Sequence, residues 1–118
     1  MPRVLIVDDD ALVLRIERVT LTRAGFEVSA ATSVDEANGE LARATPDLVL
    51  VDLHLGSESG LDLVRTLKAS GYAGRVVVVS GQNTADGEVQ TAGADGFLAK
   101  PFTPAELVAA VRARLPLG

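Results

Sequence analysis

The stretch Arg3-Val-Leu-Ile-Val-Asp-Asp-Asp10 is an apolar run that ends abruptly in three aspartates. Successive aliphatic side chains without polar alternation are typical of a strand that is buried on both faces of a parallel sheet. In such sheets, ligands bind beyond the carboxyl ends of the strands. The segment therefore predicts a strand over Arg3–Val7 and a polar site directly after it.

Short apolar runs and stretches of helical period alternate along the rest of the chain. Further strands are predicted over Phe26–Ala31, Asp47–Val51, Arg75–Val79 and Asp95–Ala99. Helices are predicted over Ala11–Ala24, from Ser33 past Leu41, over Leu61–Ser70, around Ala85–Ala92 and from Thr103 to Leu115. The pattern indicates an α/β fold, a single doubly wound five-stranded parallel sheet with helices on both faces. At 118 residues, the chain is expected to form one domain over residues 1–118.

Particular residues mark where the predicted helices begin and which positions are apolar. Asp10 is assigned as the N-cap of the first helix, whose apolar positions Leu12, Ile16 and Val19 recur at helical spacing. Capping boxes are predicted at Ser33 with Glu36 and at Thr103 with Glu106.

Composition and charge exclude several functional classes. Eleven basic and sixteen acidic side chains give a net charge of −5, which repels a nucleic-acid backbone. The chain contains no cysteine and one histidine, so any metal must be bound by oxygen atoms. Its longest aliphatic runs have four residues, far short of a bilayer span or a signal peptide. We therefore expect a cytoplasmic protein that binds neither nucleic acid nor a membrane directly.

Several polar residues follow predicted strands and should meet at one edge of the sheet. Asp8 and Asp9 follow the first strand, Asp52 the third, Ser80 the fourth and Lys100 the fifth. In a flavodoxin-like order, 2-1-3-4-5, the first and third strands flank the switch point where ligands bind. The sequence therefore predicts that acidic side chains, a hydroxyl and an ammonium share one site.

Four motifs carry a resemblance to a known family. They are Val4-Leu-Ile-Val-Asp-Asp-Asp10, Leu50-Val-Asp-Leu53 with Gly60 eight residues after Asp52, Val79-Ser-Gly81, and Ala92-Gly-Ala-Asp-Gly-Phe-Leu-Ala-Lys-Pro-Phe102. In this order and at this spacing, they resemble the receiver domains of two-component response regulators, over the whole chain.

This resemblance implies a phosphoacceptor function and assigns roles to the site residues. Asp52 would accept a phosphoryl group from a histidine kinase or a phosphotransfer protein, and Ser80 and Lys100 would contact the phosphoryl oxygens. Mg²⁺, for which Mn²⁺ can substitute, would be bound by Asp9, Asp52 and the backbone carbonyl of His54, with Asp8 acting through water. The resemblance also implies an output partner or an attached effector domain, neither of which the sequence identifies, a homodimer formed on phosphorylation as one form of output, and a cis Lys100–Pro101 peptide bond.

Phosphoryl transfer calls for these residue types independently of the family. It needs an ionised carboxylate as nucleophile and cations that neutralise the developing charge. Mg²⁺ prefers hard oxygen ligands and keeps several waters, which suits two carboxylates and a carbonyl. Carboxylates that converge without a cation repel one another and become easier to protonate. Lys100, one of only two lysines, lies in an apolar segment where a purely solvated charge would be out of place.

Two segments depart from the family pattern. The loop Leu53-His-Leu-Gly56 lacks the proline usual there, so we expect it to be more mobile. The stretch from Ser80 to Gly93 is about half a helical turn shorter than is usual in the family, and we therefore expect the fourth helix to be shortened or irregular. Gln82, two residues after Ser80, is expected to orient the water that hydrolyses the phosphoryl group, and His54 to matter less.

Three other functions share features with this sequence. A dehalogenase-type aspartyl-phosphate hydrolase would need a second acid two residues after the nucleophile, where this chain has His54. A flavodoxin-like module would need a phosphate-binding loop after the first strand, where this chain has three aspartates that would repel anionic FMN. A degenerate receiver, folded but not phosphorylated and serving only in protein interactions, is the remaining alternative.

Overall fold

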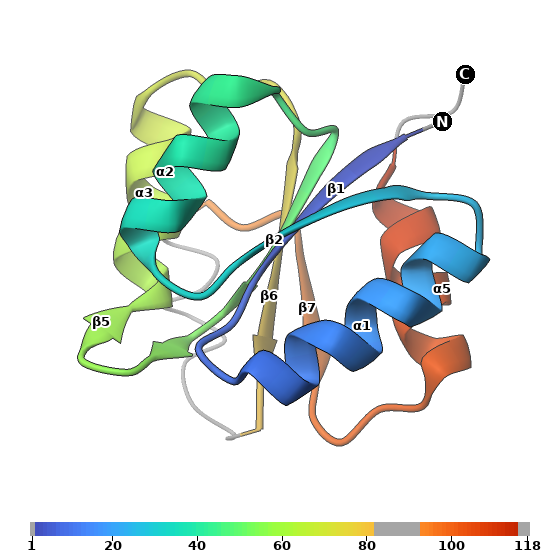
Figure 1. Ribbon diagram of the computed structural model, residues 1–118. Coiled ribbons are helices and arrows are strands. Elements are labelled where there is room, and N and C mark those ends of the chain that lie inside the picture. The colour runs from blue at the N-terminus through green and yellow to red at the C-terminus, as the bar shows by residue number, and fades with distance from the viewer. Residues whose placement is uncertain (1, 82–92, 116–118) are drawn as a thin grey trace.

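Five parallel strands form a twisted sheet at the centre of the computed structural model, which describes residues 2–81 and 93–115 (Figure 1). The strands are β1 (Arg3–Val7), β2 (Glu27–Ala31), β3 (Leu48–Asp52), β6 (Arg75–Ser80) and β7 (Gly96–Ala99). Their order in the sheet is β2-β1-β3-β6-β7. Numbered by sheet strands alone, this is the order 2-1-3-4-5, so the predicted fold class is confirmed.

Helices cover both faces of the sheet, in two layers. They are α1 (Ala11–Arg23), α2 (Val34–Arg43), α3 (Gly60–Ala69) and α5 (Pro104–Arg114). Helices α2 and α3 lie on one face and α1 and α5 on the other (Figure 1). The helix expected around residues 85–92 lies outside the described residues. None of the helices in the described ranges is long and apolar enough to cross a bilayer.

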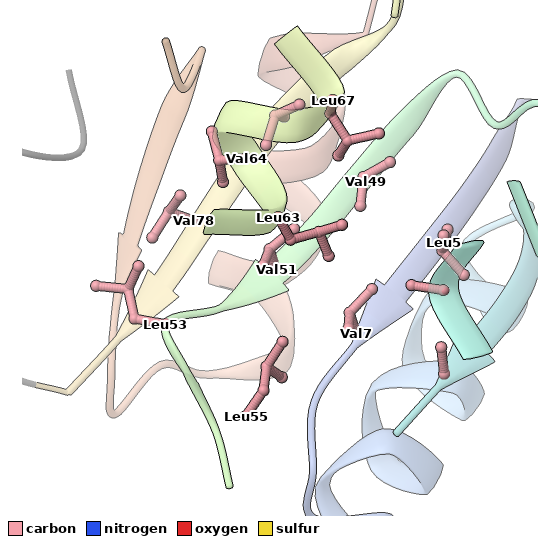
Figure 2. Packing of buried hydrophobic residues seen from close by; sticks show 13 residues of the cluster. Leu5, Val7, Val49, Val51, Leu53, Leu55, Leu63, Val64, Leu67 and Val78 are labelled. Atoms are coloured by element: carbon pink, nitrogen blue, oxygen red, sulfur yellow. The ribbon is translucent and has the colours of Figure 1, made fainter. Parts of the chain in front are cut away.

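Each face of the sheet has its own hydrophobic core because neighbouring residues of a strand point to opposite sides. Under α2 and α3, strand residues such as Val7, Val51 and Val78 belong to one cluster with Leu63 and Leu67 of α3 (Figure 2). The other core, beneath α1 and α5, contains Val4, Ile6, Leu48, Leu50, Val77, Val79, Leu14, Leu21, Leu107 and Val111. The continuous aliphatic runs of the sequence thus reflect strands buried on both sides.

The predicted caps form, with one difference. The Asp10 side chain accepts hydrogen bonds from the amides of Leu12 and Val13, which confirms it as the N-cap of α1. The box of Thr103 with Glu106 is complete, whereas at α2 only half of the expected box is present. There the Ser33 hydroxyl accepts from the amide of Glu36, but the Glu36 carboxylate reaches back to Thr32 instead.

Helix α1 is rotated so that the apolar positions recognised in its sequence lie outside. Leu12, Ile16 and Val19 are 65%, 55% and 45% exposed. The buried positions of α1 are Leu14, Glu17 and Leu21. Both sets recur at helical spacing on opposite sides of the helix, so spacing alone does not decide between them. The cap at Asp10 and the short connection from β1 fix the rotation.

The segment after Asp52, which the sequence predicts to be mobile, contains a short hairpin, and its mobility stays a prediction. Its two strands are β4 (His54–Leu55) and β5 (Glu58–Ser59), joined by a turn at Gly56 with φ of 63°. Leu55 is buried in the core under α2 and α3 (Figure 2). The Glu58 carboxylate accepts a hydrogen bond from the amide of Val34, at the N-terminus of α2. This core contact and this helix terminus hold the hairpin against the domain.

Candidate functional site

The predicted site residues lie at one edge of the sheet because parallel strands end on the same side. Asp52 and Ser80 are the last residues of β3 and β6, while Asp8 and Lys100 directly follow β1 and β7. Asp8, Asp52 and Ser80 are all buried. The sequence thus correctly predicted that these residues lie at the same edge of the sheet. The prediction was possible because a polar residue that follows a parallel strand is placed where that strand ends.

Lys100 joins the two buried carboxylates. Its Nζ donates a hydrogen bond to Oδ2 of Asp52 at 2.6 Å and lies 3.6 Å from Oδ2 of Asp8. Its backbone amide donates to the carbonyl oxygen of Ser80 at 2.9 Å, which continues the pairing of β6 with β7. The peptide bond that follows, Lys100–Pro101, is cis as expected. Although burial lowers the pKa of Lys100, its hydrogen bond with Asp52 and the negative charges nearby raise it overall, so the side chain is an ammonium.

Backbone amides bind the remaining oxygens of the two acids. Oδ1 of Asp52 accepts from the amide of His54 at 2.8 Å, and Oδ1 of Asp8 accepts from the amide of Asp10 at 2.9 Å. Burial raises the pKa of Asp8 to about 6, against the lowering effect of its bond with Asp10, and the proximity of Asp52 raises it too. The direction of the pKa shift of Asp8 agrees with the expectation that converging acids become easier to protonate, although burial rather than Asp52 is the larger cause.

Asp9 and His54 occupy the outer part of this edge. Both are exposed, and the Asp9 carboxylate faces the hairpin, with its Oδ2 3.8 Å from the point where a Cβ on Gly56 would lie. The backbone amide of His54 binds Asp52, whereas the roles of its carbonyl and of Asp9 toward a metal stay predictions. Gln82, the residue expected to orient water, lies outside the described residues.

The chemistry of the donor set fits a magnesium ion held mainly through water. Among residues 2–81 and 93–115, no group of three or more acidic, histidine or cysteine side chains is arranged to bind a metal ion. Mg²⁺ does not need such a group, because it commonly binds one or two carboxylates and keeps several waters. Asp8 and Asp52, buried together, and Asp9 at the rim offer only oxygen atoms, as this ion prefers.

A fourth acid, Glu17, was not predicted to belong to this region. It is 4% exposed on the inner side of α1, between Leu14 and Leu21. Burial, followed by the negative charge of Asp8, raises the pKa of Glu17 to about 7, while Lys100 acts in the opposite direction. The helical spacing of Leu14, Glu17 and Leu21 was the sequence signal for a buried Glu17. The apolar positions recognised in the sequence of α1 were instead Leu12, Ile16 and Val19, which lie on the opposite side of the helix.

The order of the strands and the polar residues at their ends both recur in a known family. Residues 4–112 match the family described as response regulator receiver domain. The chain belongs to this family. The match covers every described strand of the sheet apart from the first residue of β1, together with all the predicted site residues.

Curated relatives of this receiver domain are longer than the chain. The DNA-binding response regulator MtrA of Mycobacterium tuberculosis is 38% identical over 114 residues, which cover 96% of this chain and 50% of that protein. The transcriptional regulatory protein PrrA of Mycobacterium leprae is 40% identical over 116 residues, covering 97% and 50%. The chain therefore spans about half the length of these relatives.

Solved structures agree with the assignment over almost the whole receiver domain. The chemotaxis protein CheY4 of Vibrio cholerae superposes with a TM-score of 0.91 at 26% identity, covering 98% of this chain and 99% of that one. The receiver domain of NtrX from Brucella abortus gives a TM-score of 0.87 at 28% identity, covering 95% and 97%. The chain is similar to both in fold and in extent.

Proposed function

We propose that this receiver domain accepts one phosphoryl group on Asp52 from a partner histidine kinase or phosphotransfer protein. The observation that carries the proposal is the position of Lys100, whose Nζ lies 2.6 Å from Asp52 and 3.6 Å from Asp8 at the predicted ligand edge. A half-buried lysine that bridges two buried carboxylates supplies a cation where a phosphoryl group on Asp52 would add negative charge.

Each residue of the site has a defined part in the transfer. A carboxylate oxygen of Asp52 attacks the phosphorus of a phosphohistidine, so that an O–P bond forms while the N–P bond breaks and the imidazole leaves. The amide of His54 orients the Asp52 carboxylate, to which it donates at 2.8 Å. Lys100 then neutralises phosphoryl oxygens, and Ser80, buried at the end of the neighbouring strand, is proposed to contact them.

The metal is part of the proposal. We propose that Asp9, Asp52 and the carbonyl of His54 bind Mg²⁺, that Asp8 supports it through water, and that Mn²⁺ substitutes. When bound, the ion would offset the negative charge of the phosphoryl group and of the acids. The same site is proposed to hydrolyse its own acyl phosphate, so the domain catalyses both the gain and the loss of the mark.

The proposal covers phosphorylation alone and does not extend to the process that the phosphorylated domain regulates. The words DNA-binding and transcriptional describe MtrA and PrrA as whole proteins, and for this chain we propose the phosphoacceptor step alone. The cytoplasmic location, an output partner and a homodimer formed on phosphorylation stay predictions from the sequence.

Intact mass after treatment with a small acyl or amido phosphate tests the proposal. We expect the protein to gain one phosphoryl group with Mg²⁺ or Mn²⁺ and none after chelation. Asp52→Asn should abolish labelling, whereas Asp35→Asn, which removes an exposed charge on α2, should label like the parent.

Each other outcome contradicts a separate part of the proposal. Labelling that persists in Asp52→Asn would remove Asp52 as the acceptor, and labelling that survives chelation would remove the metal. If the parent, correctly folded, is never labelled by these donors or by a phosphorylated kinase, the degenerate receiver becomes the better description.

A further inference from the structure

The buried charges at this edge of the sheet do not balance, and the excess depends on Glu17. Three acids in the described part of the chain are buried: Asp8 and Asp52 at this edge, at 3% and 6% exposure, and Glu17 on the inner side of α1, at 4%. Lys100 supplies one positive charge. With all four groups ionised, two net negative charges remain, which is the charge that one divalent cation cancels.

Glu17 has no local partner to account for its burial. Within residues 2–81 and 93–115, no hydrogen bond or ion pair holds its carboxylate, and because no fully buried side-chain oxygen there lacks a partner, the carboxylate keeps some contact with solvent. The groups that do act on it electrostatically are Asp8, Lys100 and Asp52, all of which belong to the proposed phosphorylation site. Its neighbours on the inner side of α1, Leu14 and Leu21, are apolar residues of the core.

A charge in this position is costly for folding. Burial of a carboxylate without a hydrogen-bond partner is unfavourable, and an apolar side chain of similar volume removes that cost. Side chains that break the local pattern of a helix without a gain in stability are expected to serve the function of the site. The groups coupled to Glu17 indicate which function that is.

We propose that Glu17 is a positioning residue for the divalent cation of the receiver site: its carboxylate, buried on the inner side of the helix that directly follows the acidic turn, raises the affinity for the ion without ligating it. This inference rests on the proposed function. Glu17 acts through the field of its charge, which partly offsets the positive charge of Lys100 and leaves Asp8 and Asp52 free to interact with the metal.

Binding of Mn²⁺ measures this effect without any turnover. The free ion is followed by electron paramagnetic resonance at pH 8, where Glu17 is ionised, and Mg²⁺ affinity is obtained by competition. Glu17→Gln keeps the shape of the side chain and removes the charge, so we expect the dissociation constant to rise roughly three- to tenfold. The matched control Asp35→Asn changes the net charge equally on an exposed face and should leave it unchanged.

A second pair of variants separates charge from packing. Glu17→Leu should weaken Mn²⁺ binding as much as Glu17→Gln while raising the thermal midpoint, because it removes the buried charge and adds apolar contact. Glu17→Asp should restore most of the affinity. If Glu17 were purely structural, no variant would bind Mn²⁺ more weakly while unfolding at a higher temperature. If Glu17→Gln does not fold, the Leu and Asp variants carry the comparison.

The failures of the two proposals are distinguishable. If the parent binds Mn²⁺ and Glu17→Gln binds it as tightly as Asp35→Asn does, Glu17 has no role toward the metal and this inference is overturned, while the proposed function stands. If the parent binds neither Mn²⁺ nor Mg²⁺, the proposed function fails at its metal and the role of Glu17 falls with it.

Discussion

Two glycines, each in a helix that covers the same face of the sheet, should respond in opposite ways to the same substitution. Gly60 is the buried first residue of α3, and its amide donates to the carbonyl of Leu53 at 2.9 Å. A Cβ there would meet the carbonyl oxygen of Asp52 and would lie 2.8 Å from the Cα of Leu53. Gly39 lies in an exposed part of α2, and a Cβ there would meet nothing within 4 Å.

The expected magnitudes follow from these surroundings. In open space, Gly39→Ala should stabilise the fold by about 1 kcal/mol, because alanine favours the helix and glycine gains more entropy on unfolding. Gly60→Ala has the same propensity gain but forces backbone atoms apart, since the contacts are with main chain rather than with a flexible side chain. We expect a net loss of about 2 kcal/mol, so that the two variants differ by about 3 kcal/mol.

Urea unfolding followed by circular dichroism measures both variants against the parent. The start of α3 is built on the backbone of Asp52, so Gly60→Ala should also slow phosphorylation, whereas Gly39→Ala should not. If Gly60→Ala proves as stable as Gly39→Ala, the reasoning is refuted, because the close approach of α3 to Asp52 would then not be a constraint.

Two other perturbations address buried charge. The free energy of unfolding should fall as the pH rises from about 4.5 to about 7, because the folded chain retains on Glu17 a proton that the unfolded chain has released. Glu17→Gln should remove about 3 kcal/mol of that fall in urea unfolding at a series of pH values, and unchanged pH dependence would contradict the assignment. Asp95→Ala should cost about 2 kcal/mol, since Asp95 accepts from the buried amide of Val76 and from Lys68, both at 2.8 Å. Arg75→Ala removes only the half-exposed ion-pair partner of Asp95, whose Nη1 lies 3.8 Å from Oδ1 of Asp95, and should cost under about 0.5 kcal/mol in the same assay. Equal losses of stability in the Asp95 and Arg75 variants would refute this difference.

The sheet and the composition of its polar edge could be predicted because both depend on local sequence. Runs such as Val4–Val7 and Leu48–Val51 have no polar face, which only a doubly covered strand tolerates. Once the order of the strands is known, the positions of Asp8, Asp52 and Lys100 follow from where each strand ends.

The hairpin after Asp52 could not be predicted because distant contacts determine it. Its two strands have two residues each, too few for a periodic pattern. Leu55 enters a core formed by other elements, and Glu58 binds the amide of Val34, 24 residues earlier. The missing proline was a correct local observation, but it gave no sign of these contacts.

The rotation of α1 links the surface of the domain to the electrostatics of its site. Asp10 caps the helix directly after the acidic turn, so the direction in which the first residues of α1 point is fixed by the end of β1. The same rotation turns Ile16 outward and Glu17 inward, because adjacent residues lie about 100° apart on a helix. A helix that supplies no proposed ligand therefore buries an acid on its inner side, and sequence patterns alone would have placed that acid in solvent.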